Sequence, residues 1–288
     1  MTTLVAWVSY QNRKPSCLNI ASDSRFSWGS DAIHWDCGRK IFWSKNGSEI
    51  FGYAGDVVSQ SNMLSQLCEL VDYSTIIATE GDAETRHSIF LDLLKSAYAA
   101  QVGTQRRRMV TFHGTRQILM KAPQDEEILP REYVTFRLWR TCYEPTKDIW
   151  LDKEHKFPEI IDDRNIDRNI FPQLALAAGS GGAIFRAERD KNFRKYGYTS
   201  RAVFAALMCA IGKDGDKLSG GPAQAVTLGL TGTPKPIGFV IDGERSVAGM
   251  RLGDLGAGGE IEWRNSSFEY LDKVNLTLAP GASRHIYW

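Results

Sequence analysis

The spacing of apolar residues changes along the chain, and each change marks a change in predicted secondary structure. The first part holds short apolar runs rich in β-branched and aromatic residues, which predict strands at 3–8, 17–22, 40–43 and 49–54. Residues 45–48, Lys-Asn-Gly-Ser, join the last two, and Asn-Gly is a strong signal for a hairpin turn. Apolar residues then recur at helical spacing over 56–73 and 85–101, which predicts two amphipathic helices.

The second half of the chain repeats this order of strands and helices. A short apolar run at 173–178 precedes the sequence Gly-Ser-Gly-Gly at 179–182. Helical spacing follows over 183–190 and 199–212, and strand-like pieces broken by Gly and Pro return from residue 223. Runs of strands beside runs of helices indicate an α+β protein with separate layers and argue against an alternating parallel sheet.

Residues 104–172 differ from the rest of the chain in charge. They hold 13 basic and 12 acidic residues among 69, about 36%, whereas 24% of the whole chain is charged. Within this segment, residues 133–139 alternate between apolar and polar types as a strand does. We therefore expect one domain over 1–288 that carries a charged insertion at about 104–172.

The charge balance and the cysteine pattern narrow the class of protein. The chain has 35 Lys and Arg against 34 Asp and Glu, whereas nucleic-acid binders usually carry a basic excess. No apolar run reaches the roughly 18 residues of a membrane span. The five cysteines form no CxxC pair and the five histidines show no metal-ligand spacing. Since a signal-peptide pattern is also lacking, we expect a cytoplasmic protein without metal, cofactor, nucleic acid or membrane.

The candidate chemistry begins at the second residue. Thr2 is small, and an initiator Met1 before a small residue is normally removed, so the mature chain would begin with a free threonine. A Thr hydroxyl is a weak nucleophile, but an N-terminal Thr carries its own base, an α-amino group with a pKa of about 7.7–8.0. A start of Met-Thr alone is more often an ordinary exposed terminus, so the rest of the sequence has to decide.

Six short motifs, taken together in their order along the chain, argue that Thr2 is more than an ordinary exposed terminus. They are Thr2-Thr3-Leu4-Val5-Ala6, Ala21-Ser22-Asp23-Ser24-Arg25, Lys40-Ile41-Phe42, Gly52-Tyr53-Ala54-Gly55-Asp56, Gly179-Ser180-Gly181 and Asp216-Lys217-Leu218-Ser219-Gly220-Gly221. In this order they resemble the proteasome β-subunit and the bacterial proteasome-like ring proteases, within the N-terminal nucleophile (Ntn) hydrolases. The resemblance covers about 1–103 and 173–235. It implies the Ntn-hydrolase fold, an α+β four-layer αββα sandwich of two antiparallel sheets between helix layers.

The resemblance also implies the catalytic roles. Thr2 would be the nucleophile, and Lys40 would lower the pKa values of its hydroxyl and amine through its positive charge. Asp23 would pair with Lys40 and keep it charged. The expected set is completed by three residues around the terminal amine, Ser180, Asp216 and Ser219, and by the backbone N–H of Gly55 as the oxyanion donor.

A substrate pocket follows from the same resemblance. The residues expected to line it are Phe26, Gly38, Phe42, Tyr53 and Val57, with Ser27 on the substrate backbone. This set is largely apolar, which favours a hydrophobic or aromatic residue before the cut. Phe42 and Tyr53 fit a plain core role equally well.

These residues predict a threonine endopeptidase that acts on peptides or unfolded proteins. The family resemblance adds a homo-oligomeric ring and an ATP-dependent unfoldase partner. Two departures from the family are a longer loop between Thr2 and Asp23 and the insertion at 104–172. Two alternatives stay open: a catalytically inactive scaffold subunit of a proteasome-like ring, and an Ntn amidase that acts on a small molecule.

Overall fold

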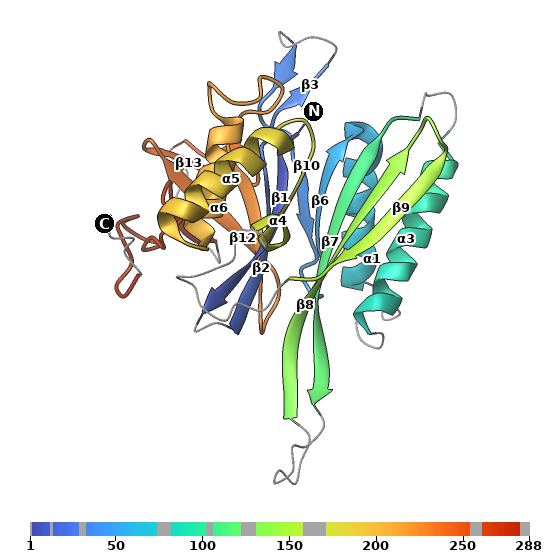
Figure 1. Cartoon of the computed structure of the whole chain (residues 1–288), viewed down its shortest axis with the longest axis horizontal. Helices are drawn as coiled ribbons and strands as arrows, with labels where there is room; N and C mark the ends of the chain where they lie inside the picture. Colours follow the sequence, from blue (N-terminus) through green and yellow to red (C-terminus); the bar gives the residue numbers. More distant parts are fainter. Residues whose placement is uncertain are drawn as a thin grey trace.

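Strands make up the largest share of the protein. The computed structural model describes residues 2–11, 14–28, 33–73, 82–101, 106–121, 131–157, 171–253 and 261–282. Strands account for 39% and helices for 28% of the structure. The strands form sheets of eight, five and two members (Figure 1). The smallest sheet pairs β3 (Phe26–Ser27) with β4 (His34–Trp35).

The eight-stranded sheet is built around the first hairpin of the chain. Its order is β10-β1-β2-β11-β12-β13-β14, and β15 pairs with β12 in parallel. The bounds are β1 (Leu4–Gln11), β2 (Lys14–Ser22), β10 (Ala175–Ala178), β11 (Gln224–Gly229), β12 (Lys235–Ile241), β13 (Glu244–Val247), β14 (Met250–Arg251) and β15 (Glu262–Asn265). In β1, Val5 and Trp7 belong to one core cluster, and Leu4 and Ala6 to another. Both faces of β1 are therefore buried, which explains its continuous apolar sequence.

The five-stranded sheet is antiparallel throughout and follows chain order. Its strands are β5 (Ile41–Trp43), β6 (Ile50–Gly55), β7 (Met109–Lys121), β8 (Arg131–Glu144) and β9 (Ile149–His155). The predicted turn at 45–48 joins β5 to β6. Strands β7 to β9 come from the segment expected as a charged insertion, 104–172, and they extend the sheet outward from β6. The rest of that segment includes 104–105, 122–130 and 158–170, which lie outside the described residues.

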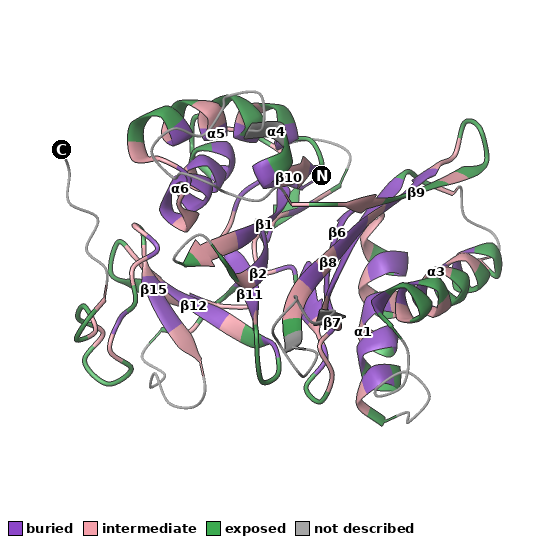
Figure 2. Ribbon diagram, turned by 60° about the horizontal axis from the view of Figure 1, so that its bottom comes forward, coloured by how far each residue is buried: buried purple, intermediate pink, exposed green. Residues whose placement is uncertain are grey.

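Two helix pairs lie against the two larger sheets (Figure 2). The bounds are α1 (Val57–Tyr73) and α3 (Ala83–Ala99) on the five-stranded sheet, α5 (Gly182–Tyr196) and α6 (Ser200–Ile211) on the eight-stranded sheet, and the short α4 (Phe171–Leu174) before β10. The side chains of Asp82 and Thr199 accept hydrogen bonds from the backbone N–H of Thr85 and Ala202, which caps α3 and α6. Within the described ranges, no helix combines the length and the apolar character that crossing a membrane requires.

Apolar side chains fill the space between the two larger sheets. This cluster takes residues from both of them, among them Leu4, Leu18, Ile20, Ile50, Phe112 and Leu138. A second cluster packs α5 and α6 against the eight-stranded sheet, and a third packs α1 and α3 against the five-stranded sheet. The two larger sheets therefore pack against each other through their inner faces. Polar residues occupy one end of β1 and β2.

The predicted elements are largely confirmed, with one helix too short. The strands predicted in the first part correspond to β1, β2, β5 and β6, and the two helices to α1 and α3. The helix predicted at 183–190 continues to the end of α5, because Phe185, Arg189 and Phe193 form one buried face. Charged residues on the outer face conceal that periodicity. The helix ends before Gly197, whose φ of 66° favours glycine.

The expected fold class, a four-layer αββα sandwich of two antiparallel sheets, is wrong. The chain is mostly β and forms three sheets, and β12 and β15 pair in parallel. The outer part of the β7–β8 hairpin projects beyond the helices (Figure 1). The expectation failed because it treated 104–172 as an addition outside the fold, whereas three of the five strands of one sheet come from it.

Candidate active site

Asp23, which follows β2, collects hydrogen-bond donors from several parts of the chain. The residue is fully buried. Its Oδ1 accepts hydrogen bonds from the backbone N–H of Thr3 and from the Nζ of Lys40, each at 2.9 Å. Its Oδ2 accepts from the backbone N–H groups of Arg25 and Gly220, each at 3.1 Å. Charge-assisted bonds of this kind suit a carboxylate, so Asp23 ties the start of β1 to two distant loops.

Lys40 is the second fully buried charge of the site. Burial lowers the pKa of Lys40, and the charge and hydrogen bond of Asp23 oppose that shift. The backbone N–H of Lys40 donates to the Oε1 of Gln224 at 2.9 Å. The amide nitrogen of Gln224 donates in turn to the carbonyl oxygens of Asp23 and Gly38. The backbone around the ion pair is therefore fixed by one buried amide side chain.

Thr2 lies immediately before Thr3 and β1 and is itself buried. A Cβ atom on Gly179 would lie 1.9 Å from the carbonyl oxygen of Thr2, and one on Gly181 would lie 1.8 Å from the Oγ1 of Thr3. Gly179 also has a φ of 87°. Only glycine fits at these two points, which explains the Gly-Ser-Gly motif: the turn after β10 packs directly on Thr2 and Thr3. Met1 lies outside the described residues.

A chain of hydroxyl groups leads from Thr3 toward the surface. The Oγ1 of Thr3 donates to the Oγ of Ser219 at 2.8 Å, and Ser219 donates to the Oδ2 of Asp216 at 2.8 Å. Ser180, which is exposed, donates to the same carboxylate oxygen. Three predicted residues, Ser180, Asp216 and Ser219, are thus brought together. Their hydrogen bonds reach the start of β1 through Thr3, a residue to which the motifs assigned no role.

Arg25 fixes the loop that carries Asp216 and Ser219. Its guanidinium forms two hydrogen bonds with the carboxylate of Asp36, at 2.7 and 2.9 Å, and a third with the carbonyl oxygen of Lys217 at 3.1 Å. The hydrogen bond and charge of Arg25 lower the pKa of Asp36. A Cβ on Gly220 would lie 2.6 Å from the Arg25 guanidinium carbon. Arg25 therefore positions the loop between Asp216 and Gly220 against the end of β2.

Gly55, the expected oxyanion donor, ends β6 two residues before α1 begins. Its φ is 117°, and a Cβ there would lie 2.3 Å from the carbonyl oxygen of Arg108. The position therefore requires glycine. A Cβ on Gly179 would lie 3.4 Å from the Cβ of Ala54, the residue before Gly55. This end of β6 therefore lies next to the Gly-Ser-Gly turn. The role of its N–H as an oxyanion donor stays a prediction.

The predicted pocket residues divide into two groups. Near the ion pair, the Phe26 ring lies 5.8 Å from the Nζ of Lys40 and packs on Gly38, where a Cβ would lie 2.3 Å from it. Ser27 donates to the carbonyl oxygen of Leu218. The second group belongs to the region of α1. Phe42 and Tyr53 are buried in the cluster under this helix, and Val57, which is half-buried, is its first residue. Phe42 and Tyr53 thus have the core environment that was the alternative for them.

Comparison with known proteins adds no assignment. No family model matches the sequence, and no curated protein matches it. The proteasome-family resemblance therefore stays a prediction carried by the six motifs and by the contacts of Asp23, Lys40 and the hydroxyl group. Among the described residues, no group of three or more His, Cys, Asp or Glu side chains could hold a metal ion.

Proposed function

We propose that the chain is a threonine-type peptidase in which Thr2, once it is the N-terminal residue, is the nucleophile. One observation carries this proposal: Thr3, the residue directly after Thr2, binds both groups, the buried Asp23–Lys40 pair through its backbone N–H and the Ser–Asp–Ser group through its hydroxyl. A hydroxyl nucleophile is activated by a nearby base or by a cation that lowers its pKa, and we assign these roles to the α-amine of Thr2 and to Lys40.

The proposed reaction has two steps. In the first, the Thr2 hydroxyl oxygen attacks the scissile carbonyl carbon while its proton passes to the Thr2 α-amine, and the C–N bond breaks as the leaving amine takes that proton. In the second, water attacks the resulting ester, and the acyl group leaves as a carboxylic acid while the hydroxyl is restored. Lys40 favours the ionised hydroxyl through its charge. The N–H of Gly55 stabilises the tetrahedral oxyanion, a contribution worth about 10²–10³ in rate.

The substrate and assembly are further parts of the proposal. Peptides and unfolded proteins are the proposed substrates, a homo-oligomeric ring is the proposed assembly, and an ATP-dependent unfoldase is its proposed partner. A cytoplasmic location fits the five cysteines, which are all free thiols. Native mass spectrometry measures the assembly, and ring-sized complexes are expected.

The nucleophile is tested by substitution of Thr2. Intact mass should report a chain that begins at Thr2, and Thr2→Ala should abolish hydrolysis of fluorogenic peptides while the far-UV circular dichroism stays unchanged. Thr2→Ser is the matched control, because it keeps a hydroxyl and should keep measurable activity. Full activity in Thr2→Ala would refute the proposal. Retention of Met1 without any turnover favours a scaffold subunit, and cleavage of small amides alone favours an amidase.

A further inference from the structure

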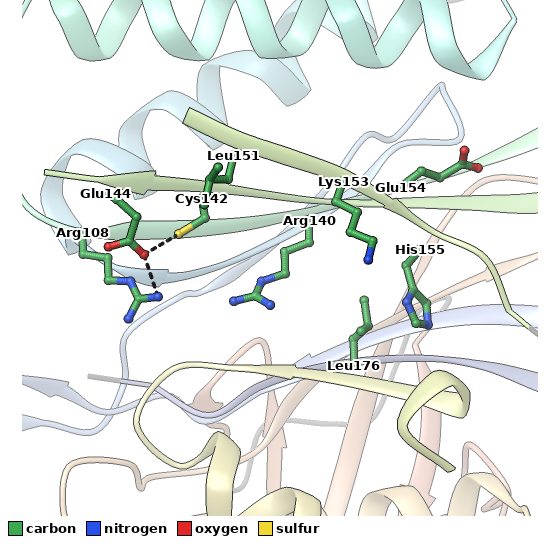
Figure 3. A pocket seen from close by; sticks show the side chains of 9 residues that line it. All are labelled: Arg108, Arg140, Cys142, Glu144, Leu151, Lys153, Glu154, His155 and Leu176. Atoms are coloured by element: carbon green, nitrogen blue, oxygen red, sulfur yellow. Dashed lines mark hydrogen bonds and ion pairs between the residues drawn. The ribbon is translucent and has the colours of Figure 1, made fainter. Parts of the chain in front are cut away.

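A second candidate site lies away from Thr2, at the outer edge of the five-stranded sheet. A cavity of about 310 Å³ opens there between β8 and β9 on one side and β10 on the other (Figure 3). Its volume is at the lower end of the range for small-molecule pockets, about 300–1,000 Å³. Its apolar lining includes Leu151 on β9 and Leu176 on β10, across the cavity, and the charged side chains of Arg140 and Lys153 extend into the space between the strands (Figure 3).

Arg140 and Lys153 are direct neighbours across the two strands. In the register of β8 and β9, Arg140 is the partner of Lys153, so both side chains leave the sheet on the same face. Like charges opposite each other in a sheet destabilise the pair. The Nε of Arg140 is also buried without a hydrogen-bond partner among the described residues. Two adjacent cations and an unsatisfied buried N–H donor therefore face one cavity.

The acidic side chains around this cavity are already engaged. Glu144 forms an ion pair with Arg108, 2.7 Å from its Nη2, and accepts a hydrogen bond from the thiol of Cys142. Glu154 binds the guanidinium of Arg137. In the parts of the chain that the structure describes, neither of these carboxylates is within ion-pair distance of Arg140 or Lys153.

His155, at the end of the cavity, adds no further charge near neutral pH. Its Nε2 lies 2.7 Å from the carbonyl oxygen of Gln173, for which it is the donor. Burial lowers the pKa of His155, and the hydrogen bond to Gln173 opposes this only in part. Among the described residues, the lining therefore has two positive charges without an ion-pair partner, those of Arg140 and Lys153.

We propose that this cavity binds a phosphate dianion held by Arg140 and Lys153. The planar guanidinium of Arg presents paired donors that match phosphate oxygens, and Lys adds a point charge. A phosphate group carries about −1.5 to −2 charges at pH 7, which balances the two cations. The same group could belong to inorganic phosphate or to a small phosphate monoester, since the apolar side chains of Leu151 and Leu176 also line the cavity and can contact a few carbon atoms. This inference does not depend on the proposed peptidase activity.

The proposal is tested by calorimetric titration and by thermal unfolding of the full chain at constant ionic strength. Inorganic phosphate and glycerol 3-phosphate are the two ligands, and sodium chloride is the reference salt. Phosphate should raise the melting temperature in a saturable manner, and the monoester should bind more tightly if Leu151 and Leu176 contact its carbon atoms. Phosphate that stabilises the chain no more than chloride does, together with no binding heat, would overturn the proposal.

Two variants and a matched control localise the binding. Arg140→Gln and Lys153→Gln should each weaken phosphate binding about ten- to hundredfold, the expected loss for one charge-assisted contact. Lys147→Gln removes the same charge from an exposed turn of the same sheet outside the cavity and should bind phosphate as the unmodified chain does. Lys153 is itself exposed, so Lys153→Gln should fold normally. Unchanged affinity in Lys153→Gln and in Arg140→Gln would contradict the assignment.

Discussion

Two buried ionic networks in this protein make an instructive contrast. Around Asp23 and Lys40, the fully buried charges contact backbone N–H groups and, through Thr3, a row of hydroxyls that ends at the surface. Around Glu49 and His113, in the five-stranded sheet, the ionisable side chains contact one another, aromatic rings and the hydroxyl groups of neighbouring strand residues. The first network is open toward the start of the chain, and the second is closed.

The closed network joins α3 to the sheet. His113 lies with its Nε2 2.7 Å from Glu49 and its Nδ1 2.9 Å from the Nδ1 of His87. His87 continues to Asp152 at 3.1 Å, and Arg86 binds the other oxygen of Glu49 at 2.8 Å. Burial of ionisable groups is therefore not itself a sign of catalysis. What separates the two networks is contact with the start of the chain, which, among the described residues, only the first one has through Thr3.

The largest effect is expected for Asp23→Asn. The change removes the counter-charge of a fully buried ammonium, and breaking a buried pair in this way costs about 3–5 kcal/mol. Peptide hydrolysis should be lost as well, and urea unfolding measures the stability. Lys40→Met serves as the comparison: Asp23 keeps three backbone N–H donors, from Thr3, Arg25 and Gly220, so this variant should be equally inactive but less destabilised. Equal destabilisation of the two would contradict this account of the carboxylate.

Glu49→Gln should lower the free energy of unfolding but, unlike Asp23→Asn, should leave the rate of peptide hydrolysis unchanged. The amide cannot neutralise Arg86, and one donor of the network is left without a charged acceptor, at a cost of about 1–3 kcal/mol. The catalytic rate of the folded fraction should equal that of the unmodified chain. A drop in that rate of tenfold or more, measured well below the unfolding temperature, would remove the distinction between the two networks.

A glycine substitution tests how the open network depends on Thr3. In Gly181→Ala, the new Cβ would meet the Thr3 Oγ1 at 1.8 Å, so Thr3 must shift and its hydrogen bond to Ser219 is broken. We expect activity to fall about tenfold or more with a stability loss of about 1 kcal/mol, since one hydrogen bond is lost. Gly182→Ala is the control, because its nearest contact is the end of a flexible arginine at 3.3 Å. Equal rates in both variants would show that Thr3 has no positioning role.

The smallest expected effect is the contribution of the closed network to the pH dependence of stability. Burial lowers the pKa of His113 below its ordinary 6.5, while Glu49 opposes the shift. The unfolded chain therefore binds the proton more readily, so this group's stabilising contribution is complete above about pH 6.5 and is lost as the pH falls toward the lowered value. The loss is at most about 1.4 kcal/mol per pH unit. Urea unfolding at pH 7.5 and 5.5 should show a weaker pH dependence in His113→Gln than in the unmodified chain, and an identical dependence would exclude His113 as a source.

Local patterns predicted the elements and several site residues, but they did not predict long-range pairings. Asp23, Lys40 and Ser219 were named as candidate site residues because each belongs to a short motif. Gln224 was missed because it reaches Lys40 from 184 positions away and stands in no motif. Thr3 was assigned no role because its side-chain contact depends on the loop after α6.

The error in the fold has a similar origin. In the described part of 104–172, charged residues such as Asp152 and Lys153 lie exposed on β9, the edge strand, and the alternation typical of a strand was recognised only at 133–139. Periodicity identifies a strand, but it does not identify its partner, so the pairing of β7 with β6 was not predictable from the spacing alone. The charged segment was therefore taken as an insertion, although it supplies three strands of a sheet.

The central claim, that Thr2 is the nucleophile, is tested most directly by locating a covalent adduct. The full chain is incubated with a peptide that carries an electrophilic vinyl sulfone, and the modified residue is identified by mass spectrometry after digestion. The account predicts one adduct, on Thr2, with parallel loss of peptide hydrolysis and no adduct in Thr2→Ala. An adduct on another residue that accompanies the loss of activity, or an adduct of equal yield in Thr2→Ala, would contradict it.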